Sequence, residues 1–293
     1  MVQTLYPEAP AITFIDWMEI GVPFVLVMLP ITWFFLTRSF GVTGSFTGSD
    51  EVIDSELAAL GPMQPGEKRV LIVFICTGLG WIFRDVWATS LGIDHLVHDT
   101  TVAMLAALAL FILPSGSSTG LGTRLLNWEQ AQTVPWGVAM IVGGGYAIAK
   151  GFATTGLATW LGEVLAPIGA LPLPVIVLLV VLFMTFITEI NSNTATASIF
   201  LPVLATMAAA GHTHPYLLMI PATFACSCAF MLPSGTGPNA VICGSGMVTI
   251  PQMSRAGLRM NFISVAVLSL VMVLFAIPLL GISATPPSWA VLP

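Results

Sequence analysis

Residues 188–198 read TEINSNTATAS, a run of carboxylate, carboxamide and hydroxyl side chains. The stretches that flank it, 172–187 and 199–210, are almost entirely apolar. A membrane interior tolerates such polar groups only where protein, a bound solute or a water-filled cavity satisfies them. The stretch therefore predicts the tip of a hairpin that enters the membrane and coordinates an ion together with an anionic solute.

The composition of the whole chain agrees with a membrane environment. Of the 293 residues, 56% are hydrophobic and only 8% are charged, and the mean hydropathy is +0.95. Soluble domains contain about a quarter charged residues. We therefore predict an all-α, multi-pass integral membrane protein whose surroundings are the lipid bilayer. The net charge of −6 gives no indication of nucleic-acid binding.

Apolar stretches locate the expected membrane spans. We predict spans at 20–37, 70–83, 101–114, 135–152 and 260–280, joined by polar loops at 38–69, 85–99, 115–133 and 248–259. A helical apolar stripe at 157–168 predicts a short helix in the membrane interface.

The two limbs around the opening stretch, 172–187 and 194–210, are each shorter than the roughly 20 residues that a crossing needs. Together they predict a re-entrant hairpin that returns to the side from which it entered. With that return, six of the eight Lys and Arg residues fall on the cytoplasmic side, as the positive-inside rule requires. These six are Arg38, Lys68, Arg69, Arg124, Arg255 and Arg259.

A second polar interruption follows at 233–239, which reads PSGTGPN inside an otherwise apolar segment from 216 to 246. Prolines and glycines at this density predict a broken helix. A hairpin tip that faces a broken helix brings together helix N-termini, which favour anions, and free carbonyls, which favour Na⁺. The two interruptions thus predict one binding site.

Several motifs, taken together, resemble one transporter family. They are TExxSNTATA at 188–197, AALGPM to EKRV at 58–70, PWGV at 135–138 with the triple glycine at 143–145, and FMLP to TxPNA at 230–240. In these motifs the chain resembles the divalent anion/sodium symporter family, the sodium-coupled dicarboxylate, citrate and sulfate transporters.

The resemblance implies an elevator-type transporter made of two inverted repeats, each with a re-entrant hairpin and a broken helix. It assigns 1–37 to a lead-in and the last helix of repeat one, and 38–69 to a cytoplasmic loop. Residues 70–170 become scaffold helices and the interfacial helix. Residues 171–293 become part of the transport domain, with the hairpin at 172–210, the broken helix at 216–246 and the last helix at 260–282.

The resemblance also implies roles for single residues. The expected substrate ligands are Ser192, Asn193, Thr194, Thr236 and Gly237. The expected sodium ligands are Thr188, Asn193 and the carbonyls of Asn191 and Gly235. Gly237 stands where the family usually has proline, and Asn191 where a small residue is common, so both bear on substrate preference. Sodium is the co-transported ion, and no other cofactor is implied.

Only one Ser-Asn-Thr occurs in the chain, whereas the family pattern has two. The resemblance therefore implies a carboxy-terminal part that holds one sodium site and half of the substrate site, with the first repeat missing. Such a chain is not expected to transport alone. The full-length form is expected to be a homodimer in a bacterial-type cytoplasmic membrane that takes up a dicarboxylate, a tricarboxylate or sulfate.

Glu189 allows two interpretations, because an ionisable group at membrane depth is a functional candidate. It can couple transport to a cation, or it can hold the tip by capping backbone N–H groups or by pairing with a base such as Lys150. Two functional alternatives follow: a proton-coupled anion permease or antiporter that uses Glu189, and a non-transporting membrane subunit. The sequence lacks HExxH, GxSxG and a membrane Asp pair, so we do not predict an enzyme.

Overall fold

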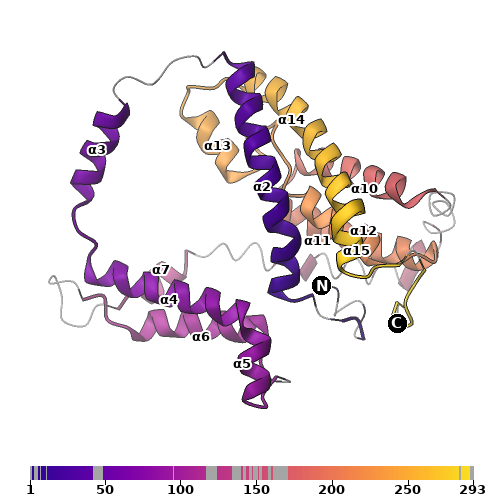
Figure 1. Cartoon of the computed structure of the whole chain (residues 1–293), viewed down its shortest axis with the longest axis horizontal. Helices are drawn as coiled ribbons and strands as arrows, with labels where there is room; N and C mark the ends of the chain where they lie inside the picture. The colour runs from indigo at the N-terminus through magenta and orange to yellow at the C-terminus, as the bar shows by residue number, and fades with distance from the viewer. Residues whose placement is uncertain are drawn as a thin grey trace. The chain divides into compact units, whose positions relative to one another are not determined.

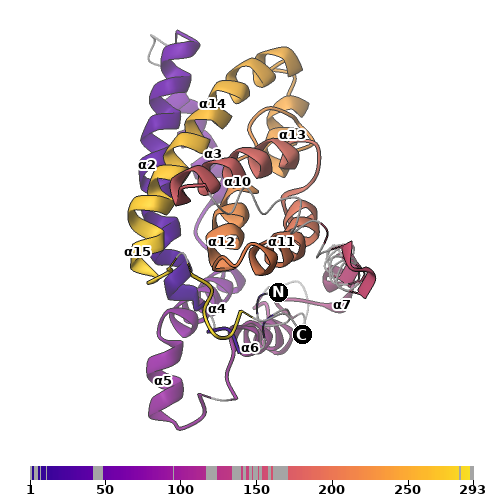
Figure 2. The same ribbon diagram turned by 90° about the vertical axis from the view of Figure 1, so that its right-hand side faces the viewer.

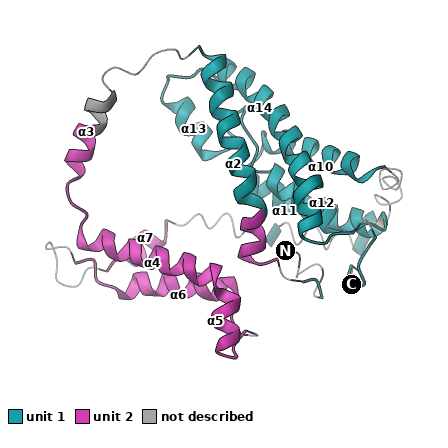
Figure 3. Ribbon diagram, in the orientation of Figure 1, with its two compact units in different colours: residues 1–11, 20–41, 136–293 teal, residues 12–19, 42–135 magenta. Residues whose placement is uncertain are grey.

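The computed structural model describes residues 2, 6, 8–10, 12–41, 49–94, 96–116, 124–133, 171–283 and 285–290, and single positions between 140 and 160. Helices dominate these residues (Figure 1, and turned by 90° in Figure 2). The chain divides into two compact units (Figure 3). Unit 1 comprises residues 1–11, 20–41 and 136–293, and unit 2 comprises residues 12–19 and 42–135.

Unit 1 contains the residues of both polar interruptions. Its helices are most of α2 (Phe14–Ser39), α10 (Leu173–Thr188), α11 (Asn193–Ala210), α12 (Tyr216–Ala225), α13 (Gly237–Gly244) and α14 (Ile250–Val271). α14 continues through a π-helical turn, Met272–Ala276, into α15 (Ile277–Leu279).

The centre of unit 1 is α12, which is buried on nearly every face. α10, α11 and α14 all pack against it, and Figure 2 shows α10 lying between α14 and the pair α11 and α12. From α2, Phe24 meets Phe224 of α12 edge to face, with ring centroids 6.3 Å apart. An apolar helix surrounded in this way needs no polar face, which explains its sequence.

The two limbs of the expected hairpin lie beside each other. The rings of Phe183 on α10 and Phe200 on α11 are edge to face, 5.3 Å between centroids. An apolar cavity of about 420 Å³ is lined by both limbs. The exposed surface of α10 is apolar too, because side chains such as Val175 and Leu178 are partly exposed. A helix that is apolar on its outer face as well suits a membrane better than water.

The prediction of a loop at 248–259, with the last helix starting at residue 260, is wrong. α14 begins at Ile250, where Thr249 and Gln252 form a capping box and Pro251 occupies the first turn. Arg255 and Arg259 are exposed on this helix, so their charge marks one face and not a loop.

Unit 2 contains α3 (Ser49–Leu60), α4 (Pro65–Ile82), α5 (Arg84–Ser90), α6 (Asp99–Ile112) and α7 (Trp128–Ala131). α4 packs against α6, and the axes of α4 and α5 differ by 75°. The sequence predicted a single span at 70–83 followed by a loop at 85–99. Residues 84–90 are instead helical: the chain bends sharply at Phe83 and then continues as the short helix α5.

Two helices in the described part of the chain are long and apolar enough to cross a membrane: Phe14–Ser39 and the continuous segment Ile250–Leu279. The bent pair α4 and α5 would be a third if it forms one span. The expected span at 135–152 and the interfacial helix at 157–168 lie largely outside the described residues, as does Lys150.

Candidate functional site

The hairpin tip brings three oxygen atoms together. α10 ends at Thr188 and α11 begins at Asn193, so residues 189–192 form the turn between them. The buried hydroxyl of Thr188 lies 2.9 Å from Asn193 Oδ1 and 3.1 Å from the carbonyl oxygen of Cys226. A hydroxyl has one proton to donate, so it satisfies only one of these acceptors at a time. Three converging oxygens with one proton are a suitable set of ligands for a hard cation.

The second interruption begins earlier than the sequence predicted. α12 ends at Ala225, and α13 begins only at Gly237, so the break covers residues 226–236. Asn239 supports this long break, because its Nδ2 donates to the carbonyls of Ala229 (3.0 Å) and Leu232 (3.1 Å). Free carbonyls beyond the end of a helix need such partners.

The carboxylate of Glu189 reaches from the hairpin tip into the break. It accepts backbone N–H bonds from Phe230 (2.7 Å), Met231 (2.9 and 3.1 Å) and Leu232 (3.0 Å). The amide of Asn261, on α14, donates a further bond of 2.7 Å. Glu189 is only 3% exposed, so water contributes little to balancing its charge. Backbone dipoles and one carboxamide do so instead.

Glu189 forms no ion pair within the described part of the chain. The sequence raised two structural roles for it, capping N–H groups at the tip or pairing with Lys150. The carboxylate does cap backbone N–H groups, but those of the break and not those of the tip. Lys150 lies outside the described residues.

Helices start at both interruptions with a hydroxyl cap. Ser192 Oγ accepts from the N–H of Ala195 (3.2 Å), and Thr236 Oγ1 accepts from the N–H of Asn239 (3.3 Å). The expected ligands Thr194 and Gly237 stand in the first turns of these helices and are exposed. Each N-terminus carries partial positive charge, which favours a carboxylate or sulfate oxygen.

The remaining expected ligands, Gly235 and Asn191, differ in how closely they pack against the other groups of the hairpin tip. A Cβ added to Gly235 would lie 3.3 Å from Glu189 Oε2 and 3.1 Å from Ala229 Cβ, so this glycine packs directly against the carboxylate. Ser234 Oγ donates to the backbone oxygen of Glu189 over 3.4 Å. Asn191 is exposed, and its side-chain oxygen accepts from the N–H of Ser192 (3.0 Å).

Sequence reasoning missed three contributors to this site: the Cys226 carbonyl, Asn239 as the support of the break, and Asn261. Two of them left a signal. A helix that ends at a break exposes carbonyls, which predicts a ligand such as that of Cys226. A carboxamide inside an apolar span, as at Asn261, indicates a buried polar partner.

Apolar helices of spanning length, with buried polar groups gathered where helices stop, are typical of integral membrane proteins that bind ions or solutes at membrane depth. The family model described as the sodium:sulfate symporter transmembrane region matches residues 7–282, and the chain belongs to this family. The resemblance inferred from the Ser-Asn-Thr motif is thereby confirmed, and the family is one of transporters and not of enzymes.

Named relatives agree. The chain is 42% identical over 278 residues to the sodium-dependent dicarboxylate transporter SdcS of Staphylococcus saprophyticus, with 94% of this chain and 53% of the relative covered. It is 41% identical over 279 residues to the protein of the same name from Staphylococcus aureus, with the same coverage. The chain thus spans about half the length of these relatives.

Proposed function

We propose that the chain takes part in sodium-coupled uptake of a divalent anion, with C4-dicarboxylates such as succinate as the first candidates. The observation that carries this proposal is the convergence of Thr188 Oγ1, Asn193 Oδ1 and the Cys226 carbonyl at the buried end of the tip. The printed names of the relatives support both the ion and the class of anion.

Sodium binds, in this proposal, to the oxygens of Thr188 and Asn193 and to the carbonyls of Asn191 and Gly235. The structure adds the Cys226 carbonyl as a candidate ligand, because Thr188 already lies within hydrogen-bond distance of it. A bound cation would resolve the competition of two acceptors for the single Thr188 proton.

The anion binds beside the cation at the two helix N-termini. Its ligands are the neutral donors Ser192, Asn193, Thr194 and Thr236, which hold it without a fixed buried positive charge. Gly237 adjoins open space, since a Cβ added there meets nothing within 4 Å. This space makes residue 237 a determinant of whether the site prefers a dicarboxylate, a tricarboxylate or sulfate.

The described residues supply one sodium site and half of the substrate site. A first repeat with its own Ser-Asn-Thr provides the other half, in an elevator-type transporter of two inverted repeats that forms a homodimer in the bacterial cytoplasmic membrane. Hairpin 172–210 and the broken helix move together in this mechanism. The Glu189 bonds from the tip to the break are consistent with such a joint movement.

Uptake of labelled succinate into proteoliposomes tests the proposal. It is measured for the chain alone and for the chain joined to the amino-terminal remainder of the S. saprophyticus relative, under a sodium, potassium or proton gradient. We expect sodium-driven uptake only in the joined form. Asn193→Ala and Thr194→Ala should abolish it without loss of membrane insertion, and near-normal uptake in both variants would contradict the site.

Proton coupling through Glu189 is the competing function. Four donor groups already engage this carboxylate, so a proton on it would have to displace one of them. This geometry favours sodium over protons. Uptake driven by a proton gradient without sodium would reverse that preference.

A further inference from the structure

One face of α14 contacts the backbone of the break. Ser254, Gly257 and Asn261 follow one another at spacings of three and four, so they lie on the same side of the helix. Ser254 Oγ donates to the Met231 carbonyl over 3.2 Å. Asn261 Oδ1 accepts from the N–H of Phe230 over 3.3 Å.

The backbone of the break comes closest to α14 at Gly257. A Cβ added to it would lie 2.2 Å from the carbonyl oxygen of Phe230 and 2.4 Å from its carbonyl carbon. These neighbours are backbone atoms of a residue whose N–H group is bonded by both Glu189 and Asn261, so they have little freedom to yield. Any residue larger than glycine must therefore push α14 and the break apart.

Asn261 links this face to the hairpin tip as well. Its side chain is fully buried, and it bonds both Phe230 and the Glu189 carboxylate. The break and the tip are thus held by one helix. That helix, Ile250–Leu279, is one of the two in the described part of the chain that are long enough to cross a membrane.

We propose that Ser254, Gly257 and Asn261 are positioning residues that set the distance between the Cys226 carbonyl and the Thr188 hydroxyl. The proposal rests on the sodium site of the proposed function. If the α14 face moves, the break moves with it, and the three oxygens no longer meet. Sodium affinity then falls, although none of these three residues touches the ion.

Thiol labelling of the full 293-residue chain in proteoliposomes tests this. Cys76→Ser and Cys243→Ser leave Cys226 and Cys228, which are buried in the break, as reporters of its opening. Reaction with N-ethylmaleimide is followed without sodium, with choline in its place, and over a sodium titration. The variants are Ser254→Ala, Gly257→Ala and Asn261→Ala. The control is Gly78→Ala in α4, where an added Cβ meets nothing within 4 Å.

We expect Gly257→Ala, by steric clash, and Asn261→Ala, by loss of its two side-chain bonds, to speed labelling without sodium. Both should raise the half-protecting sodium concentration about tenfold. Ser254→Ala removes only one partly buried bond and should raise that concentration about threefold. Because this variant should fold, it keeps the test decisive if the other two do not. Gly78→Ala should match the parent.

Variants that melt at lower temperature but keep the parental half-protecting concentration would overturn the positioning role. Failure of the proposed function looks different: the parent itself would show no sodium protection. Labelling without sodium then still reports whether the α14 face of Ser254, Gly257 and Asn261 holds the break. Rates equal to the parent in all three variants would overturn the positioning role.

Discussion

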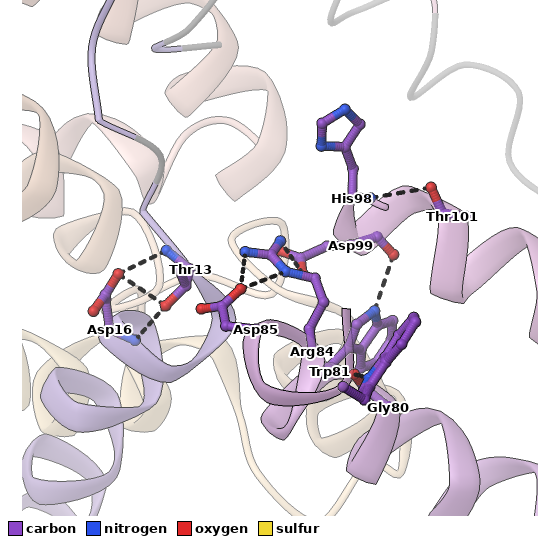
Figure 4. Close-up of polar contacts among 10 residues, drawn as sticks. Thr13, Asp16, Gly80, Trp81, Arg84, Asp85, His98, Asp99 and Thr101 are labelled. Carbon is purple, nitrogen blue, oxygen red and sulfur yellow. Dashed lines mark hydrogen bonds and ion pairs between the residues drawn. The ribbon is translucent and has the colours of Figure 1, made fainter. Parts of the chain in front are cut away.

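Two interruptions of apolar helices in this chain are held in opposite ways. At residues 226–236 of unit 1, the carboxylate of Glu189 is buried and bonded to backbone N–H groups. At the corner between α4 and α5 in unit 2, Arg84 pairs with Asp99 (2.7 Å) and Asp85 (2.9 Å) (Figure 4). The first arrangement joins segments far apart in the sequence, and the second fixes a local bend.

The corner is open to water on its acidic side, whereas the Arg84 side chain is only 15% exposed. The side chains of Asp85 and Asp99 are 62% and 41% exposed, and Figure 4 shows the Arg84 guanidinium between them. Indole N–H groups of Trp81 and Trp87 add bonds to the carbonyls of Asp99 and Gly80, each 3.0 Å long. Water can replace the carboxylates here, so each ion pair contributes little free energy.

Water cannot replace Glu189. Its removal would leave several N–H groups of the break unsatisfied in a buried site, and each such group costs about 1–3 kcal/mol. A buried carboxylate that bonds backbone N–H groups can therefore stabilise an interrupted helix more than two ion pairs with exposed carboxylates do. The predictions below test that contrast, from the largest effect to the smallest.

Replacing Glu189 with leucine should destabilise the chain by about 3–5 kcal/mol, because leucine satisfies none of the N–H groups that the carboxylate bonds. Glu189→Gln should cost less, because it keeps one acceptor oxygen. Thermal unfolding in detergent measures both, with the exposed Glu129→Ala as control. A leucine variant as stable as the parent would show that the break does not depend on this carboxylate.

Gly235→Ala should destabilise by about 1–3 kcal/mol, because its methyl group meets Ala229 and Glu189 within 3.1–3.3 Å. Gly237→Ala, two residues along, meets nothing within 4 Å and should leave the unfolding temperature unchanged. Unfolding of the two variants side by side gives the measurement. Equal losses would mean that Glu189 does not pack the break as closely as described.

His214 lies buried in the turn between α11 and α12, and it should make the stability of the chain depend on pH. Burial lowers its pKa below the usual value of about 6.5, and its Nδ1 accepts the N–H of Tyr216. As the pH falls, His214 therefore takes up a proton in the unfolded chain at a higher pH than in the folded chain. Stability from this group is complete above about pH 6.5 and falls as the pH drops below it, by at most about 1.4 kcal/mol per unit.

Unfolding between pH 7.5 and 5 measures this loss, and His214→Gln should flatten it. The neighbouring His212 is exposed, with a positive φ of 50° that asparagine tolerates, so His212→Asn should keep the parental pH dependence. A parental slope in His214→Gln would assign the pH dependence to other groups.

Arg84→Ala should have the smallest effect, about 0.5–1 kcal/mol, because pairs with solvent-exposed carboxylates are weak and screened. The difference from the parent should shrink between 50 mM and 1 M salt, where screening removes most of the pair energy. A loss of unfolding free energy as large as that of Glu189→Leu, or one independent of salt, would contradict this. It would mean that the corner depends on a buried polar interaction, as the break does.

The polar tip at 188–198 and the later part of the break, from residue 233, could be predicted from local sequence, because polar residues, prolines and glycines inside apolar segments are visible without a fold. The start of α14 was also signalled, by the Thr249 to Gln252 capping box, but hydropathy alone concealed it. The bend at Phe83 left no such mark. The ion pair of Arg84 with Asp99 stabilises this bend, but it joins residues 15 positions apart, so no periodic sequence pattern announces it.

Sequence alone determined that this is a membrane chain of the sodium:sulfate symporter family, that 188–198 is a polar tip, and that Thr188 and Asn193 are candidate ligands. The first two conclusions follow from composition and from motifs of adjacent residues, and the ligand roles are what the family resemblance of those motifs implies. Tertiary structure alone decided that Glu189 bonds residues 41 to 43 positions away, and that Asn261, 72 positions away, joins them. Backbone N–H groups occur in almost every residue, so only folding selects which of them a buried carboxylate will meet.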